Sequence, residues 1–377
     1  MRRLTTYIHN LADWPRFRWN RELLAEKLAL VRHEQGRLLG RMENLGFPLR
    51  QEAVLGTLTQ DVLKSSEIEG ENFDAETVRS SIARRIGIEK AGLSPVDRNV
   101  EGVVEMMLDA TGNYDEPLTA ERICAWHASL FPAGLSGMKR VVTGAWREDN
   151  QGPMQVVSGP IGRERVHFEA PASARLSAEM GQFIDWFNGD GSALPDAMDG
   201  VVKAALVHLW FVTVHPFEDG NGRIARALAD MALARSEASS QRFYSMSAQI
   251  RLERAAYYAC LERTQKGSMD VTGWIDWFLD CLGQAIAGAQ RTLAMVLWKA
   301  RFWDAMAAES LNGRQRLVLN LLLDGFEGKL TTSKWAKLAK CSQDSAMRDI
   351  AALVELGILL RSPEGGRSTS YGLSSCP

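Results

Sequence analysis

The sequence HPFEDGNGRIAR, at residues 215–226, determines how this chain of 377 residues is organised. The apolar run 201–214 precedes it and has the composition of a buried helix. Pro216 ends that run, because proline lacks the N–H that a helix interior needs. Ile224 and Leu228 then recur at helical spacing, which predicts a second helix directly after the turn.

The turn between these helices has the composition of an anion-binding site. Residues 220–222 read Gly-Asn-Gly, so they allow positive φ and leave bare N–H groups at the positive end of a helix dipole. Arg223 and Arg226 are three residues apart and share one side of the first helical turn. Asp219 is a hard oxygen ligand suited to Mg²⁺, and His215 can accept a proton near pH 7. Singly, such features are more often a helix cap, a structural histidine or a solvated arginine pair, but together they are the parts that phosphoryl transfer requires.

The order of these residues resembles the signature His-x-Phe-x-Asp-Gly-Asn-Gly-Arg-x-x-Arg of the Fic family, whose members transfer AMP from ATP to a hydroxyl side chain of a protein. The resemblance implies that His215 deprotonates the target hydroxyl, that Asp219 holds Mg²⁺, and that Arg226 binds the γ-phosphate. The residues implied to cradle the α- and β-phosphates are Gly220, Asn221, Gly222 and Arg223. Some relatives that phosphorylate carry a substituted turn, so the intact turn here favours AMP transfer.

Length and composition set broad limits. The chain is long enough for two or three domains, and its 46% hydrophobic and 24% charged content is typical of a soluble protein. A net charge of -2 excludes a polyanion binder that works by bulk charge. We expect no signal peptide and no membrane span. The five cysteines are scattered and lack Cys-x-x-Cys spacing, so we expect reduced thiols in a cytoplasmic protein.

A second motif lies near the end of the helix expected at about 51–66. Its inward face is marked by Leu55, Leu58 and Val62. The same spacing continues to Ser65 and Glu69, and a carboxylate on a core-facing stripe needs a cationic partner. The alternative is an exposed acidic helix end. Ser-x-x-x-Glu-Gly resembles the inhibitory motif of Fic proteins, which implies that Glu69 pairs with Arg226, occupies the γ-phosphate position and prevents a productive ATP pose.

Residues 133–172 lose helical periodicity and contain two β-like runs, 154–158 and 165–169, which predict a hairpin. A lone hairpin is only marginally stable, so it should lie on the helical body. In Fic enzymes a hairpin flap at this place aligns the target segment by strand addition. The resemblance continues through Gly144 and Arg147. The flap residues that it implies near the nucleotide are Val156, Val157, Ser158 and Gly159.

A helix expected at about 248–265 contains the pair Tyr257-Tyr258, and an aromatic pair at such a place is usually core. In Fic relatives a Tyr-Tyr pair in this helix, with an amide side chain seven residues later, lines the adenine pocket. Here the amide is Gln265 where relatives often have Asn, which moves the donor and acceptor by one methylene. His208, in the apolar run before the signature, is predicted to be a satisfied core histidine.

The two ends of the chain have different patterns. Residues 1–20 predict an irregular arm anchored by aromatic side chains, and this opening resembles an N-terminal extension found in a subset of Fic proteins. Residues 314–377 predict three helices and a hairpin, which resemble a winged helix. Its candidate basic face comprises Lys334, Lys337, Lys340, Arg348, Arg361 and Arg367. Asp344 and Asp349 oppose phosphate binding, so a protein-interaction role is favoured and DNA binding is the alternative.

The predicted fold is mainly α, with a Fic-type helical core, a β-hairpin flap, an N-terminal helical extension and a C-terminal winged-helix domain. The predicted domains are 1–92, 93–310 and 311–377. The predicted function is a protein adenylyltransferase that uses ATP and Mg²⁺ and is autoinhibited by Glu69. Its target is a hydroxyl-bearing protein or the chain itself, and the resemblance favours a homodimer. The alternatives are a nucleotide-sensing DNA-binding regulator, an enzyme that removes AMP from modified proteins, and a transferase of another phosphate-containing group.

Overall fold

The computed structural model describes residues 6–88, 97–150, 152–160, 162–189, 198–307, 309–323, 326, 328–362 and 369–374. Within these ranges the chain is mostly helical and carries three two-stranded antiparallel sheets, which confirms the predicted fold class. It divides into two units, Met1–Ala289 and Gln290–Pro377, and the division falls within helix α11 (Thr272–Ala305). The predicted domain boundaries at residues 92 and 310 stay predictions.

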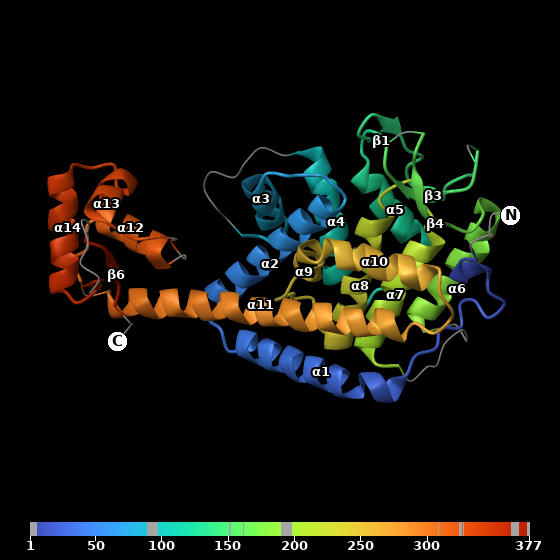
Figure 1. Cartoon of the computed structure of the whole chain (residues 1–377), viewed down its shortest axis with the longest axis horizontal. Helices are drawn as coiled ribbons and strands as arrows, with labels where there is room; N and C mark the ends of the chain where they lie inside the picture. Colours follow the sequence, from blue (N-terminus) through green and yellow to red (C-terminus); the bar gives the residue numbers. More distant parts are fainter. Residues whose placement is uncertain are drawn as a thin grey trace. The chain divides into compact units, whose positions relative to one another are not determined.

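Helices make up most of the first unit, shown in Figure 1. They are α1 (Arg21–Glu43), α2 (Phe47–Ile68), α3 (Ala75–Arg85), α4 (Arg98–Gly112), α5 (Ala120–Leu130), α6 (Leu176–Asn188), α7 (Gly200–Val214), α8 (Asn221–Glu237), α9 (Met246–Leu252) and α10 (Arg254–Gln265), with short 3₁₀ turns η1 (Ile8–Asn10) and η2 (Ser173–Arg175). Its strands are β1 (Leu135–Ser136), β2 (Lys139–Arg140), β3 (Gln155–Ser158) and β4 (Arg165–Glu169).

Helices α7 and α8 form the centre of the first unit. Apart from the half-buried Lys203, residues 201–214 are buried, as their apolar composition predicts, and α8 is buried from Arg223 to Ala234. Helix α8 packs against α7, α4, α2, α5 and α9. The turn between α7 and α8 is therefore held on a rigid pair of helices.

The aromatic residues of the N-terminal arm anchor it to this centre. The indole of Trp14 lies 5.3 Å from the ring of Phe17 and 6.1 Å from that of Trp210 on α7, and its Nε1 donates to Glu179. Phe17 is buried, so the predicted anchoring by these two residues is confirmed. On α1, Leu24 and Val31 are buried, whereas Leu23 is 68% exposed.

Two details of the first unit differ from the predictions. The single helix expected at about 248–265 is two helices, because Glu253 leaves helical geometry at φ −105°, ψ 25° between α9 and α10. The hairpin of β1 and β2 was not predicted, since strands of two residues carry no periodic signal.

The predicted flap hairpin is present. Strands β3 and β4 pair antiparallel, with Gln155 opposite Glu169 and Ser158 opposite Arg165, and the register shifts between Val156 and Val157. The hairpin rests on the N-terminal arm, where Val156 packs against the cluster of Tyr7, Phe168 and Ala170.

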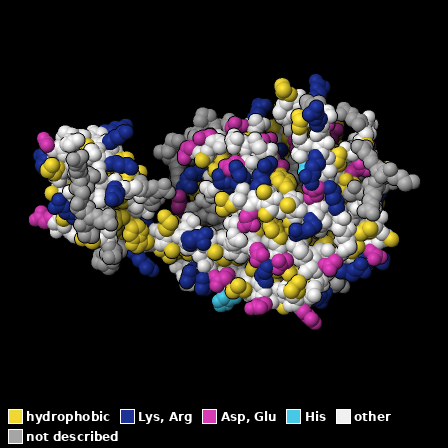
Figure 2. All heavy atoms as spheres, in the orientation of Figure 1, with side chains coloured by type: hydrophobic (Ala, Val, Ile, Leu, Met, Phe, Trp, Pro, Cys, Tyr) yellow, Lys and Arg dark blue, Asp and Glu magenta, His cyan; other side chains and the backbone are white. Residues whose placement is uncertain are grey.

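The second unit has its own core. Its elements are α12 (Gly313–Leu323), α13 (Thr332–Leu338), α14 (Gln343–Glu355), β5 (Leu359–Arg361) and β6 (Tyr371–Leu373). Trp335, Ile350 and Leu353 are buried there together with Phe302 from the end of α11. Arg367 lies outside the described residues. Figure 2 shows basic and acidic side chains interspersed on the visible face of each unit, and binding of DNA or of a protein by the second unit stays a prediction.

The described residues bear on two expectations from the sequence, one about membrane spans and one about cysteines. None of their helices is both long and apolar enough to cross a membrane. The described cysteines, Cys124, Cys260, Cys281 and Cys341, are free thiols.

A buried charge network fixes the last turns of α8. Arg242 is fully buried and pairs through Nη2 with Asp230 Oδ1 at 3.0 Å and through Nη1 with Glu237 Oε2 at 3.0 Å. Its guanidinium also lies 4.5 Å from the centre of the Tyr244 ring. Burial lowers the pKa of Arg242, but the neighbouring tyrosine and acidic groups outweigh it and the net shift is upward. Removing the arginine would leave buried carboxylates without their counter-charge.

We predict that Arg242→Ala lowers the free energy of unfolding of the first unit by about 3–5 kcal/mol, because breaking a buried ion pair leaves an uncompensated charge. Chemical unfolding followed by tryptophan fluorescence measures this change. The control is Arg251→Ala, which removes a partly exposed pair with Glu67 and should cost about 1 kcal/mol or less. Equal losses in the two variants would contradict the prediction.

Candidate active site

His215 occupies a constrained position at the end of α7. It has φ 50° and ψ 59°, in the left-handed region that residues other than glycine rarely adopt. Its N–H donates to Phe211 O at 2.9 Å, and its carbonyl accepts from Arg147 Nε at 2.8 Å. Such a backbone conformation persists only where the surroundings over-determine it, and it is typical of functional sites.

Arg147 supplies much of that constraint. Its side chain is 1% exposed, and its backbone N–H donates to Pro216 O at 2.9 Å. Its Nη1 pairs with Asp149 at 2.5 Å and its Nη2 donates to Pro171 O at 2.5 Å, so it joins the chain on both sides of the flap to the loop after His215. The resemblance to Fic proteins extends through Arg147 but implied no role for it.

The charge state of His215 is set by its surroundings. Burial lowers the pKa of His215 to about 4, although the carbonyl of Val212 opposes this shift. His215 Nδ1 lies 3.3 Å from Val212 O, a geometry that assigns the proton to Nδ1. The imidazole is therefore neutral near pH 7, with Nε2 able to accept a proton.

The signature turn holds its shape by internal hydrogen bonds. Asn221 is buried, its Oδ1 accepts from Phe217 N at 3.0 Å, and its Nδ2 donates to Phe217 O at 2.8 Å. Of the predicted phosphate cradle, Asn221 can therefore offer an anion only its backbone N–H. Gly220 has φ 78°, and a Cβ at this position would lie 3.0 Å from the ring of Phe131.

Arg226 makes the ion pair that the resemblance implies. Its Nη2 lies 2.9 Å from Glu69 Oε1, so the predicted ion pair is present. Its Nε donates to Ser65 Oγ at 2.9 Å and its Nη2 also donates to Ser65 O at 2.9 Å. Burial disfavours the charge of Arg226, but the Glu69 carboxylate outweighs it and the pKa of Arg226 is raised.

Two observations test whether a polyphosphate fits here. Arg226 Nη1 and Arg223 Nε are buried and have no hydrogen-bond partner. Gly222 has no side chain, so its backbone is bare. A Cβ at this position would lie 2.1 Å from Glu69 Oε1, so no larger residue fits there. A phosphate that approached this turn would find unpaired donors and a helix N-terminus, so the residues fit an anionic ligand.

Asp219 is the predicted Mg²⁺ ligand. Its Oδ1 accepts from Gly220 N at 2.6 Å, and its Oδ2 accepts from the hydroxyl of Ser136 at the end of β1. Among the described residues no group of three or more His, Cys, Asp or Glu side chains could hold a metal. A single carboxylate fits Mg²⁺ that takes its other ligands from nucleotide phosphates and water.

The residues implied for the adenine pocket lie on α10, beside the end of α7. Tyr257 is buried and its hydroxyl lies 2.8 Å from His208 Nε2, so His208 is a satisfied core histidine as predicted. Gln265 is buried and its Nε2 lies 3.3 Å from Thr213 Oγ1. Tyr258 is half-buried, 5.2 Å from the guanidinium of Arg254. Tyr258 is thus the most exposed member of the set.

The flap is fastened to the same helix. His167 Nδ1 and Arg165 Nη2, both on β4, lie 2.7 and 3.0 Å from the carboxylate of Glu262. Ser158 Oγ lies 2.6 Å from His167 Nε2 on the opposite strand. Val157 is 48% exposed and Gly159 is exposed, so the outer edge of the flap is open.

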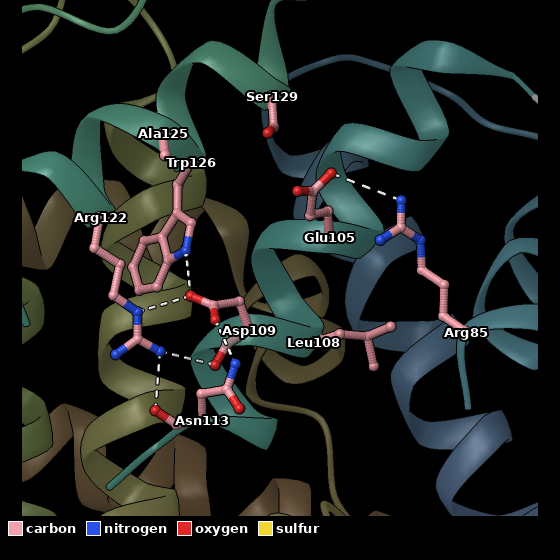
Figure 3. A pocket seen from close by; sticks show the side chains of 9 residues that line it. All are labelled: Arg85, Glu105, Leu108, Asp109, Asn113, Arg122, Ala125, Trp126 and Ser129. Carbon is pink, nitrogen blue, oxygen red and sulfur yellow. Dashed lines mark hydrogen bonds and ion pairs between the residues drawn. The ribbon is translucent and has the colours of Figure 1, made fainter. Parts of the chain in front are cut away.

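A surface pocket lies elsewhere on the first unit, among α3, α4 and α5 (Figure 3). It has a volume of about 540 Å³, and no predicted site residue lines it. Its polar groups bind one another: Asp109 accepts from Arg122 Nε, Trp126 Nε1 and Asn113 Nδ2, each at 2.7 Å. Since these groups are satisfied within the fold, this pocket offers little to a ligand.

The sequence missed several residues that shape the site. They are His127, whose ring stacks on that of Phe217 at 4.0 Å, Ser136, which binds Asp219, Glu262, which fastens the flap, and Glu71, which binds Arg223. Each acts through a tertiary contact over a long sequence separation, and only Glu71 lay close to a motif that the sequence singled out.

Two regions of the chain match known protein families. Residues 117–233 match the Fic/DOC family, and residues 7–88 match a domain of unknown function (DUF4172). The first region contains the whole signature turn, so the chain contains a Fic/DOC domain.

Curated relatives match over part of the chain. It is 30% identical over 128 residues to the protein adenylyltransferase Fic of Drosophila willistoni, and 32% identical over 128 residues to that of Culex quinquefasciatus. In both cases the matched region covers 34% of this chain and 22% of the relative. The chain therefore matches about a fifth of the length of these relatives.

Solved structures resemble this chain in fold over a larger part of its length than the curated relatives match in sequence. A Fic family protein from Desulfovibrio desulfuricans matches 93% of this chain and 97% of its own with a TM-score of 0.51 at 18% identity. A Fic domain containing signaling protein from Bacteroides thetaiotaomicron matches 69% of this chain and 95% of its own, also with a TM-score of 0.51 at 18% identity.

We predict that the imidazole of His215 titrates with a midpoint near pH 4, because burial penalises its charged form. The measurement is the pH dependence of imidazole NMR shifts in the full chain, assigned by comparison with His215→Ala. A solvated histidine titrates near pH 6.5, and a midpoint there would show that the ring is not desolvated.

Proposed function

We propose that this chain, which contains a Fic/DOC domain at residues 117–233, transfers AMP from MgATP to a hydroxyl group of a protein. One observation carries the proposal. A neutral histidine held in a left-handed conformation stands directly before a bare helix N-terminus that bears two buried arginines with unpaired donors. A base beside an anion site is the arrangement that phosphoryl transfer to a hydroxyl needs.

The reaction follows from the positions of these groups. The N–H groups at the start of α8 and the guanidinium of Arg223 bind the α- and β-phosphates, and Arg226 binds the γ-phosphate. His215 Nε2 accepts the proton of the target hydroxyl as its oxygen attacks the α-phosphorus. The bond from that phosphorus to the β-bridging oxygen breaks, and pyrophosphate leaves. Mg²⁺ held by Asp219 would offset charge on the phosphates.

In this proposal the nucleotide base and the target segment bind to different parts of the site. The base lies against Tyr258, with Tyr257 and Gln265 supporting the wall of the site from α10. The target segment pairs with the outer edge of the flap at Val157 and Ser158, since an exposed strand edge binds an extended peptide through its backbone. Glu262 keeps the flap at a fixed distance from α10.

Glu69 inhibits the reaction in this proposal. Its carboxylate sits on Arg226 at 2.9 Å and within 2.1 Å of the point where a Cβ of Gly222 would lie, so it fills space beside the anion site. The γ-phosphate of ATP would compete for the same guanidinium. ATP then binds without reaching the pose that aligns the α-phosphorus for attack.

We predict that Glu69→Gly raises AMP transfer at least tenfold, because it frees the guanidinium of Arg226 for the γ-phosphate. The measurement is the incorporation of α-³²P label from ATP into protein bands, including the chain itself, compared with the unsubstituted protein. Glu67→Gln is the matched control, since Glu67 lies on the same turn but pairs with Lys64 and Arg251. An unchanged or lower rate in Glu69→Gly would refute the inhibitory role.

We predict that His215→Ala, combined with Glu69→Gly, abolishes labelling while ATP still binds, because the imidazole acts on the proton of the target and not on the phosphates. Label transfer and calorimetric ATP titration of the same variant separate the two effects. Retained labelling would remove His215 as the base. No labelling from any variant, despite ATP binding, would favour a nucleotide-sensing regulator or an enzyme that removes AMP.

A further inference from the structure

The end of α2 is a defined chain reversal that faces the start of α8. Gly70 has φ 90°, its N–H donates to Glu67 O at 3.2 Å, and the N–H of Glu71 donates to Ser66 O at 3.0 Å. These two bonds are those of a Schellman motif, which closes a helix and fixes the direction of the residue after the glycine. The motif therefore holds the backbone N–H of Glu71 on Ser66 O, which also accepts from the N–H of Glu69 at 3.1 Å.

The carboxylate of Glu71 binds the other arginine of the signature. Its Oε2 lies 2.6 Å from Arg223 Nη1. Arg223 is 2% exposed in its side chain, whereas that of Glu71 is 38% exposed, so a buried cation is held by a carboxylate at the surface. The guanidinium of Arg223 also lies 5.1 Å from the centre of the Phe131 ring, and its Nε has no partner.

The two ion pairs form a matched set. Arg223 and Arg226 are separated by about 4.5 Å along the axis of α8, at 1.5 Å per residue. Glu69 and Glu71 stand on either side of Gly70, and each pairs with one of these arginines at 2.9 and 2.6 Å. One short segment thus places an anion on each guanidinium that the proposed reaction assigns to a phosphate.

We propose that Glu71 is a second inhibitory carboxylate, which competes with the α- and β-phosphates of a nucleotide for Arg223 independently of Glu69. The proposal rests on the proposed function only for the assignment of phosphates to Arg223 and Arg226. The proposed role of Glu71 has a consequence for ADP binding that the role of Glu69 does not have. A nucleoside diphosphate lacks the γ-phosphate, so Glu71 opposes the binding of ADP, whereas Glu69 chiefly opposes the productive binding of ATP.

Calorimetric titration of the full chain with MgADP tests this inference. Because a partly exposed ion pair is modest in strength, we expect Glu71→Gln and Glu71→Ala each to raise ADP affinity about three- to tenfold. Glu67→Gln should leave ADP affinity as it is in the unsubstituted protein. The gain should shrink at high salt, since the Glu71 carboxylate is screened there. Thermal unfolding of each variant shows that the fold is retained.

The outcomes separate this inference from the proposed function. Unchanged ADP affinity in both Glu71 variants overturns it, even if Glu69→Gly labels protein strongly. A raised ADP affinity in both supports it, even if no variant transfers label. Faster labelling by the Glu69→Gly, Glu71→Gln double variant than by Glu69→Gly alone, at ATP below saturation, would support the inference and the proposed function together.

Discussion

Two buried guanidiniums at the positive end of a helix are the constraint on which the rest of the site depends. Arg223 and Arg226 are each about 2% exposed, and they lie in the first turns of α8, where the helix dipole already favours anions. Buried like charges of this kind are costly unless anions neutralise them. In this structure the anions are Glu69 and Glu71. In the proposed function, nucleotide phosphates would replace these carboxylates as partners of the same two cations.

The surrounding helices would confine the proposed exchange of carboxylates for phosphates to the start of α8 and the end of α2. Helix α8 is buried along most of its length and packs on α7, so contacts of the core position the backbone that carries the arginines. The carboxylates come from the end of α2, where their backbone is set by a closing turn and their side chains are 28% and 38% exposed. A rigid cation pair faced by a more exposed anion pair suits displacement by a ligand.

His215, the proposed base, is held by contacts that are distant in sequence. Arg147 binds the carbonyl of His215 across 68 residues and links it to both ends of the flap. Glu262 then fastens the flap to α10. His215, the flap and α10 are thus connected through two charged side chains, and neither belongs to the signature turn.

The sequence by itself determined the helical class and the turn at residues 220–222, because helical spacing and glycine chemistry are local signals. It indicated that a carboxylate on an apolar stripe, Glu69, needs a cationic partner, and the resemblance to Fic proteins implied that this partner is Arg226. It also predicted the flap and the buried state of His208. Only the tertiary structure decided that Asn221 turns its side chain to Phe217, that the helix after the signature breaks at Glu253, and that Glu71 meets Arg223. The contact of Glu71 with Arg223 joins residues 152 apart in the chain, and a linear pattern carries no record of the distance between two helices. The geometries of Asn221 and Glu253 are choices among local conformations that the same residues allow, and the surrounding fold selects one.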